Sequence, residues 1–151
     1  MNYKIEIKEI EPITVAAMRY KGIVGEAGKH MPAIFKAIKG KANGAPFFCF
    51  YEVDEQTLNG DLELCVPTEE IPNAGGIQSK ELPRIKAVCT THVGRYDTLK
   101  FAYKALHHYI QENGLHVQTP WRETYIKGPG AILKGNPGKY ITEIAIPIEQ
   151  E

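Results

Sequence analysis

The sequence has little of what marks several large classes of protein. Its 18 basic residues balance 18 acidic residues, so the formal net charge is +0 and no overall field attracts nucleic acid or acidic membranes. No stretch approaches the roughly 20 apolar residues that span a bilayer. The opening MNYKIEIKEI alternates charged and apolar residues and lacks the apolar run of a signal peptide. We therefore expect a soluble, cytoplasmic protein.

Cysteine is also scarce, and its placement excludes the usual cysteine-based frameworks. The three residues Cys49, Cys65 and Cys89 lie far apart, without a Cys-x-x-Cys pair. Such a set is typical of buried reduced thiols rather than of disulfides or a zinc site. The glycine- and proline-bearing segment 128–138 lacks the Lys-Ser/Thr ending of a phosphate loop and precedes a strand. We expect it to form turns at a mobile rim, and we expect neither a metal nor a cofactor.

What the sequence does contain is enough apolar material for one core. Its 151 residues are 43% hydrophobic, which suits a single domain, residues 1–151. Alternation from Tyr3, resumed after Pro12, predicts a long bent strand that ends at Gly22. A short helix over 29–39 should follow. The apolar runs 47–53 and 62–66 predict two further strands.

The second half shows the same order of elements. Asp97 is placed to cap a helix whose apolar residues recur at helical spacing and which ends at Asn113 and Gly114. The remaining predicted elements are three strands, over residues 84–93, 121–127 and 140–148.

Local matches support an internal duplication. Residues 62–67 (LELCVP) parallel residues 142–147 (TEIAIP), and residues 19–22 parallel residues 91–94. We therefore predict an α+β fold of two tandem β-α-β-β units, residues 1–67 and 84–151, joined by a connector over 68–83. The two units are expected to form a pseudo-twofold antiparallel sheet with two helices on one side and a central cleft.

One predicted strand joins an acid to aromatic rings. Alternation puts Trp121, Glu123 and Tyr125 on the same face. A lone glutamate in a strand is more often solvated, and a strand tryptophan or tyrosine more often belongs to the core. Glu143 has the opposite parity from its isoleucine neighbours and is left out of the candidate site.

The first half offers a second candidate wall. If Tyr51 is matched with Tyr125, then Phe47 and Cys49 fall opposite Trp121 and Glu123. His92 matches Tyr20 across the halves and is the only histidine with a case for lining the cleft.

Four segments together resemble the gyrase-inhibitor-like family, which includes the effector-binding domains of AraC-type and MerR-type activators. They are Ile10 to Gly22 with Pro12, Val15 and Ala16; His92 to Tyr96; Arg122 to Tyr125; and Thr142 to Ile148. The resemblance covers nearly the whole chain. It implies two β-α-β-β halves around a cleft for small, often cationic and aromatic molecules, with Glu123 as the central acid.

The resemblance leaves three functions open. The first is a stand-alone binding or sensing protein for hydrophobic, cationic aromatic molecules, related to multidrug-binding regulators but without direct DNA binding, because the effector-like domain fills the chain. The second is a hydrolase of electrophilic small molecules, with Glu123 activating water and Tyr125 or Tyr51 donating to the leaving group. The third is a protein-interaction role toward gyrase, for which the balanced charge offers little. We rank binding first, so the chain is expected to be non-catalytic.

Overall fold

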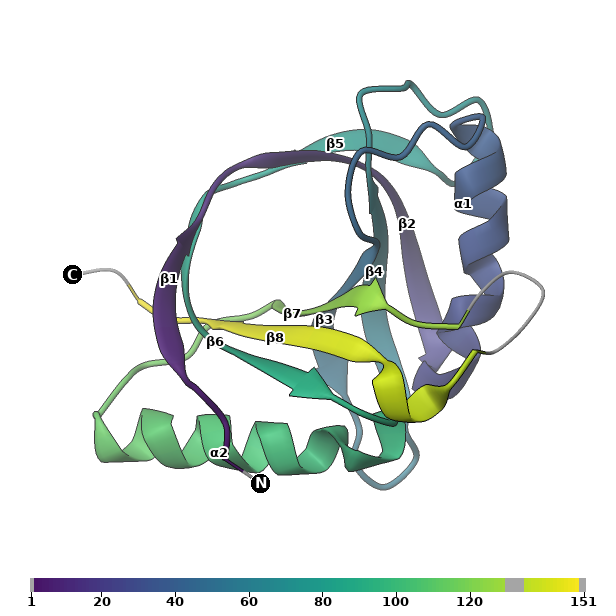
Figure 1. Cartoon of the computed structure of the whole chain (residues 1–151). Helices are drawn as coiled ribbons and strands as arrows, with labels where there is room; N and C mark the ends of the chain where they lie inside the picture. The colour runs from purple at the N-terminus through teal and green to yellow at the C-terminus, as the bar shows by residue number, and fades with distance from the viewer. Residues whose placement is uncertain (1, 130–134, 150–151) are drawn as a thin grey trace. The chain divides into compact units, whose positions relative to one another are not determined.

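The computed structural model describes residues 2–129 and 135–149, and the chain divides into two compact units. Unit 2 is the continuous segment Glu11–Arg84. Unit 1 combines the N-terminal residues up to Ile10 with the chain from Ile85 onward. Figure 1 shows the helices and strands of both units. Each unit holds strands and one α-helix, which confirms the predicted α+β class.

Unit 2 is an antiparallel sheet with a helical segment on one face. Its strands β2 (Ile13–Ile23), β3 (Phe47–Val53), β4 (Asn59–Pro67) and β5 (Gln78–Leu82) lie in the order β3-β4-β2-β5. A 3₁₀ segment η1 (Val24–His30) leads into the short helix α1 (Met31–Ala37), in which Pro32 occupies the first turn. The Tyr20 and His30 rings are 5.2 Å apart, so η1 lies on the face that Tyr20 shares with its pairing partner Leu62.

Unit 1 has the same plan. Its strands β1 (Glu6–Ile10), β6 (Ile85–Val93), β8 (Ile141–Pro147) and β7 (Trp121–Lys127) lie in the order β1-β6-β8-β7, all antiparallel. A 3₁₀ turn η2 (Tyr96–Thr98) precedes helix α2 (Leu99–Glu112), and a second turn η3 (Pro137–Lys139) precedes β8. In Figure 1, β1 lies beside β6, although the two strands are far apart in the sequence.

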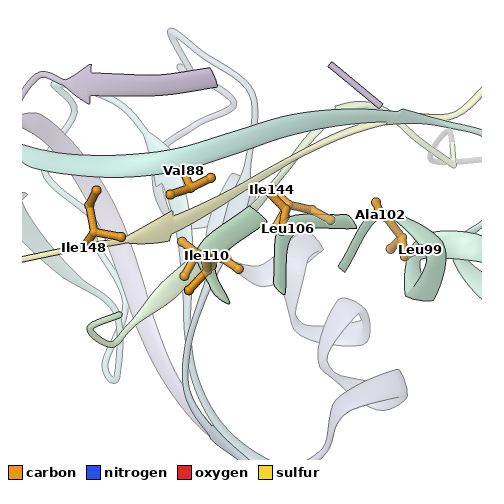
Figure 2. Close-up of a cluster of buried hydrophobic side chains, with 8 residues drawn as sticks. Val88, Leu99, Ala102, Leu106, Ile110, Ile144 and Ile148 are labelled. Carbon is orange, nitrogen blue, oxygen red and sulfur yellow. The ribbon is translucent and has the colours of Figure 1, made fainter. Parts of the chain in front are cut away.

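The core of unit 1 fills the space between α2 and one face of its sheet. Leu99, Ala102, Leu106 and Ile110 recur at the spacing of one helix face and are buried. They pack against apolar side chains of β6, of β8 and of the residue after β8, namely Val88, Ile144, Ile146 and Ile148. Figure 2 labels Val88, Ile144 and Ile148 beside the helix residues. The opposite face of the sheet holds a separate small cluster built on Ala87, Cys89 and Ala145.

The strand registers confirm that the two units are copies of one pattern. Arg19 pairs with Glu63 in unit 2, and Thr91 pairs with Glu143 in unit 1, as the sequence matches require. Each unit also carries one lysine–glutamate ion pair at the equivalent place. Lys80 Nζ lies 3.0 Å from Glu63 Oε1, and Lys8 Nζ lies 3.1 Å from Glu143 Oε2.

The two repeats exchange their first strands. Lys80, Glu81 and Leu82 of β5 match Lys8, Glu9 and Ile10 of β1 in sequence. Yet β1 pairs with β6 of unit 1, whereas β5 pairs with β2 of unit 2. The long bent strand expected from Tyr3 to Gly22 is therefore two strands, β1 in unit 1 and β2 in unit 2. The segment 68–83, expected to be a connector, contains β5.

Three other expectations concern the start of α2, the loop before β8 and membrane-spanning helices. Asp97 does not cap the second helix, because it lies inside η2 and Thr98 precedes the first residue of α2. The expected loop 128–138 falls partly outside the described residues. In the described part of the chain, no helix is long and apolar enough to cross a membrane.

Candidate functional site

Strand β7 presents three of the candidate side chains to the face that α2 covers. Glu123 pairs with Ile144, whose side chain belongs to the core beneath α2, and directly paired residues share a face of the sheet. Trp121 and Tyr125 lie two residues to either side and therefore point the same way. Trp121 packs against the edge of the same core. The acid predicted from the sequence thus faces a helix rather than bulk water.

The carboxylate of Glu123 accepts hydrogen bonds on both oxygens. Tyr125 Oη donates to Glu123 Oε1 at 2.8 Å. The hydroxyl of Tyr103, from α2, donates to Oε2 in a short contact. The indole N–H of Trp121 donates to the Tyr103 hydroxyl at 3.1 Å. These bonds hold the carboxylate in one orientation between two phenols and an indole.

Burial controls the ionisation of this cluster. It raises the pKa of Glu123 above its usual value, although the two phenol hydrogen bonds oppose part of that effect. The pKa values of Tyr103 and Tyr125 are raised well above normal, first by burial and then by the neighbouring carboxylate, so both remain protonated donors. Within residues 2–129 and 135–149, no lysine or arginine forms an ion pair with Glu123. No basic side chain of the described residues therefore neutralises this carboxylate.

Tyr96 adds a further ring to the site. It contacts Tyr125 edge to face at a centroid distance of 5.8 Å, and it lies 5.0 Å from the ring of Tyr140. Burial raises the pKa of Tyr96 to about 12, with smaller contributions from Tyr140 and Glu123, yet the residue keeps 38% of its surface exposed. A Cβ on Gly128 would lie 2.6 Å from the Tyr96 hydroxyl, so glycine is what allows this close approach. Tyr96 thus extends the group of rings around Glu123 to the protein surface.

The structure brings together three of the residues expected at the site, Trp121, Glu123 and Tyr125. His92 shares their unit but is fully buried, and both its ring nitrogens are engaged: Nδ1 by the Tyr3 hydroxyl at 2.8 Å, and Nε2 by Thr98 Oγ1 at 2.8 Å. It has no exposed surface for a ligand.

The other three expected residues lie in unit 2, and the strand registers match them differently. Cys65 and Ala145 are equivalent in the repeat, and they pair with Phe47 and Arg122. Counting along the strands from these pairs, Glu123 corresponds to Phe48 and not to Cys49.

By the same register, Tyr125 corresponds to Phe50 rather than to Tyr51. A shift of one residue exchanges the two faces of a strand. Phe47, Cys49 and Tyr51 accordingly lie on the face opposite η1, where the Tyr51 hydroxyl donates to Glu63 at 3.3 Å. Their role in a site shared with Glu123 stays a prediction.

Sequence reasoning missed Tyr103 and Tyr96. Tyr103 recurs at the helical spacing of the apolar residues of the predicted helix, and the available signal was that a phenol on such a face needs a polar partner. Tyr96 belonged to a segment used only for the family resemblance.

Among the described residues, no group of three or more histidine, cysteine, aspartate or glutamate side chains could hold a metal ion.

Solved structures provide matches along the whole chain. The C-terminal domain of EcmrR is 28% identical, with a TM-score of 0.84 and full coverage of both chains. EcmrR in a complex with DNA is 26% identical, with a TM-score of 0.85; the match covers 99% of this chain but only 58% of EcmrR. SAV2435 bound to tetraphenylphosphonium is 20% identical, with a TM-score of 0.57 over 99% of this chain and 94% of its own.

Three further comparisons concern the fold and the family of the chain. A hydrolase from Listeria innocua is 13% identical, with a TM-score of 0.70 over 97% of this chain and 92% of its own, and at this identity the likeness concerns the fold alone. No curated protein matches the sequence. The model of the GyrI-like small molecule binding domain matches residues 3–149. The chain therefore belongs to the GyrI-like small molecule binding domain family.

Proposed function

We propose that this protein binds small hydrophobic molecules that carry a positive charge and aromatic rings, and that Glu123 supplies the opposing charge. The observation that carries the proposal is a carboxylate set among the rings of Trp121, Tyr103 and Tyr125 without a lysine or arginine partner in the described residues. A carboxylate in such surroundings is costly to keep ionised, and a bound organic cation offsets that cost.

Three contributions to the free energy favour binding of such a ligand. At about 4 Å and an effective dielectric constant near 20, the attraction between two unit charges is about 4 kcal/mol before desolvation is subtracted. Each good cation–π contact adds roughly 0.5–2 kcal/mol. Burial of about 150 Å² of apolar ligand surface adds roughly 4 kcal/mol. Their sum is about 9 kcal/mol with one ring contact and about 14 kcal/mol with three strong ones, from which desolvation and an association cost of about 4 kcal/mol or more must be subtracted.

The geometry favours broad rather than narrow selectivity. Both oxygens of Glu123 already accept a phenol hydrogen bond, so charge and ring contact dominate recognition over a directed N–H donor from the ligand. Neither stacking nor a single charge requires a particular ligand outline. Tetraphenylphosphonium, which SAV2435 binds, has this chemistry and is a suitable second probe.

Titration with a fluorescent cationic rhodamine dye tests the proposal. Glu123→Gln keeps the shape of the side chain and removes its charge, and it should weaken dye binding by about tenfold to a hundredfold, equivalent to about 1.4–2.8 kcal/mol. Glu143→Gln is the matched control. Glu143 lies on the neighbouring strand of the same sheet with its side chain on the opposite face, so this variant should bind like wild type. Equal affinity of wild type and Glu123→Gln would remove the basis of the proposal.

Hydrolysis of electrophilic small molecules is the second candidate, and the Tyr125–Glu123 hydrogen bond favours it. In this reaction a water oxygen forms a bond to an electrophilic carbon while Glu123 takes the water proton. The bond to the leaving group breaks, and Tyr125 protonates the departing atom. Incubation with an epoxide followed by mass spectrometry separates the candidates, because hydrolysis adds one water to the substrate and simple binding leaves it unchanged.

A further inference from the structure

The imidazole of His92 is a buried junction between the N-terminal segment and the turn before α2. Thr98 Oγ1 donates to the Arg95 carbonyl at 2.7 Å, so its own proton is already committed. The oxygen of Thr98 therefore accepts from His92 Nε2–H at 2.8 Å, and the Arg95 carbonyl lies 3.2 Å from the same nitrogen. This arrangement leaves Nδ1 unprotonated, as the acceptor of the Tyr3 hydroxyl proton at 2.8 Å.

The turn folds closely over this junction. Gly94 has φ +139, a conformation that other residues rarely adopt, and a Cβ at this position would lie 3.4 Å from His92 Nε2. The backbone N–H of Gly94 donates to the Tyr140 carbonyl at 2.8 Å. The Arg95 carbonyl and Thr98 on either side of Tyr96 are thus both tied to His92, while the turn itself is joined to the segment before β8.

Tyr96 is the residue of this turn that reaches the candidate site. Its ring touches Tyr125, and Tyr125 donates to the carboxylate of Glu123. Its packing against Tyr140 restricts it from a second side. A continuous path of contacts therefore runs from Tyr3 through His92 and the turn to the ring beside the acid.

We propose that His92, held by Tyr3, is a positioning residue that fixes Tyr96 against Tyr125 and so sets the affinity of the site for its ligand. This inference rests on the proposed function. His92 touches no ligand in this scheme, since it has no exposed surface. Its contribution passes through the orientation of Tyr96, which makes affinity depend on an N-terminal hydroxyl outside the site.

The test is a double-mutant cycle in the full chain, with the rhodamine dye as the probe. Tyr3→Phe removes only the hydroxyl that holds His92 and should weaken binding about threefold to tenfold, the range for one lost hydrogen bond. In a Tyr96→Ala background the same Tyr3→Phe change should have no further effect, because the residue through which it acts is gone. Tyr109→Phe, at another partly buried tyrosine beside the unit 1 core, is the matched control and should bind like wild type.

The outcomes separate this inference from the proposed function. If Glu123→Gln and Tyr96→Ala weaken binding but Tyr3→Phe does not, His92 has no positioning role and the inference is overturned, while the binding function stands. An equal loss from Tyr3→Phe in the wild-type and Tyr96→Ala backgrounds also overturns it, because that loss would reflect general destabilisation. If Glu123→Gln and Tyr96→Ala leave affinity unchanged, the proposed function itself fails.

Discussion

The two equivalent lysine–glutamate pairs provide a stability experiment with its own internal control. In unit 2, Glu63 is only 2% exposed, and both its oxygens lie within 3.1 Å of Lys80 Nζ. In unit 1, the side chains of Lys8 and Glu143 are 43% and 25% exposed. The chemistry and the position in the repeat are the same, and burial is the main difference.

We expect Lys80→Met to destabilise the protein far more than Lys8→Met. Removing one partner of a fully buried pair costs about 3–5 kcal/mol. The Lys80 side chain is 36% exposed and water would reach part of the vacated space, so we expect about 2–3 kcal/mol. Lys8→Met should cost below about 1 kcal/mol, because both side chains of the Lys8–Glu143 pair are partly exposed to water.

Urea unfolding followed by circular dichroism measures both free energies. The double variant Glu63→Gln with Lys80→Met should recover part of the loss, since it leaves no uncompensated charge in the sheet. Equal costs for the two lysine substitutions, or a double variant less stable than Lys80→Met alone, would refute the reasoning that burial of Glu63 sets the penalty.

Two further predictions concern the site itself. Glu123→Gln should raise the free energy of unfolding at pH 7, because burial raises the pKa of this carboxyl in the folded protein and makes its ionised form unfavourable in the folded state. The gain should disappear as the pH falls to about 4, where the carboxyl of Glu123 also becomes protonated in the unfolded chain. Urea titrations at several pH values check this, and a gain that does not change with pH contradicts it. Gly128→Ala should weaken dye binding about fivefold or more by pushing on the Tyr96 hydroxyl, and Tyr96→Phe in the same chain should restore it by removing that hydroxyl. No recovery in the double variant would show that the clash is not the cause.

Period-two patterning was enough to predict three of the five side chains of the candidate site. In β7, alternation put Trp121, Glu123 and Tyr125 on one face, where Tyr125 donates to Glu123 and Trp121 donates to Tyr103. The partners from other elements could not be predicted in the same way. Tyr103 reaches Glu123 only because α2 packs on that face, which is a tertiary fact.

The match between β3 and β7 failed for a physical reason. The run Phe47–Val53 begins with four buried residues in succession, so it has no alternation from which the face of each side chain could be read. Only pairing with β4 fixes its register. The strand β5 was missed because it is a mostly exposed, polar edge strand. The match of its Lys80-Glu81-Leu82 to Lys8-Glu9-Ile10 was the signal that could have found it.

The exchange of first strands between the repeats bears on how such a chain could have arisen. A half-length ancestor with one repeat would have had a first strand with no place in its own sheet, so two identical molecules would have had to trade strands to become complete. Joining the two copies into one polypeptide turns that assembly from a concentration-dependent encounter into a reaction within one molecule. After gene fusion the two repeats could also diverge in sequence, so that one repeat has Glu123 and the other has Phe48 at the equivalent position.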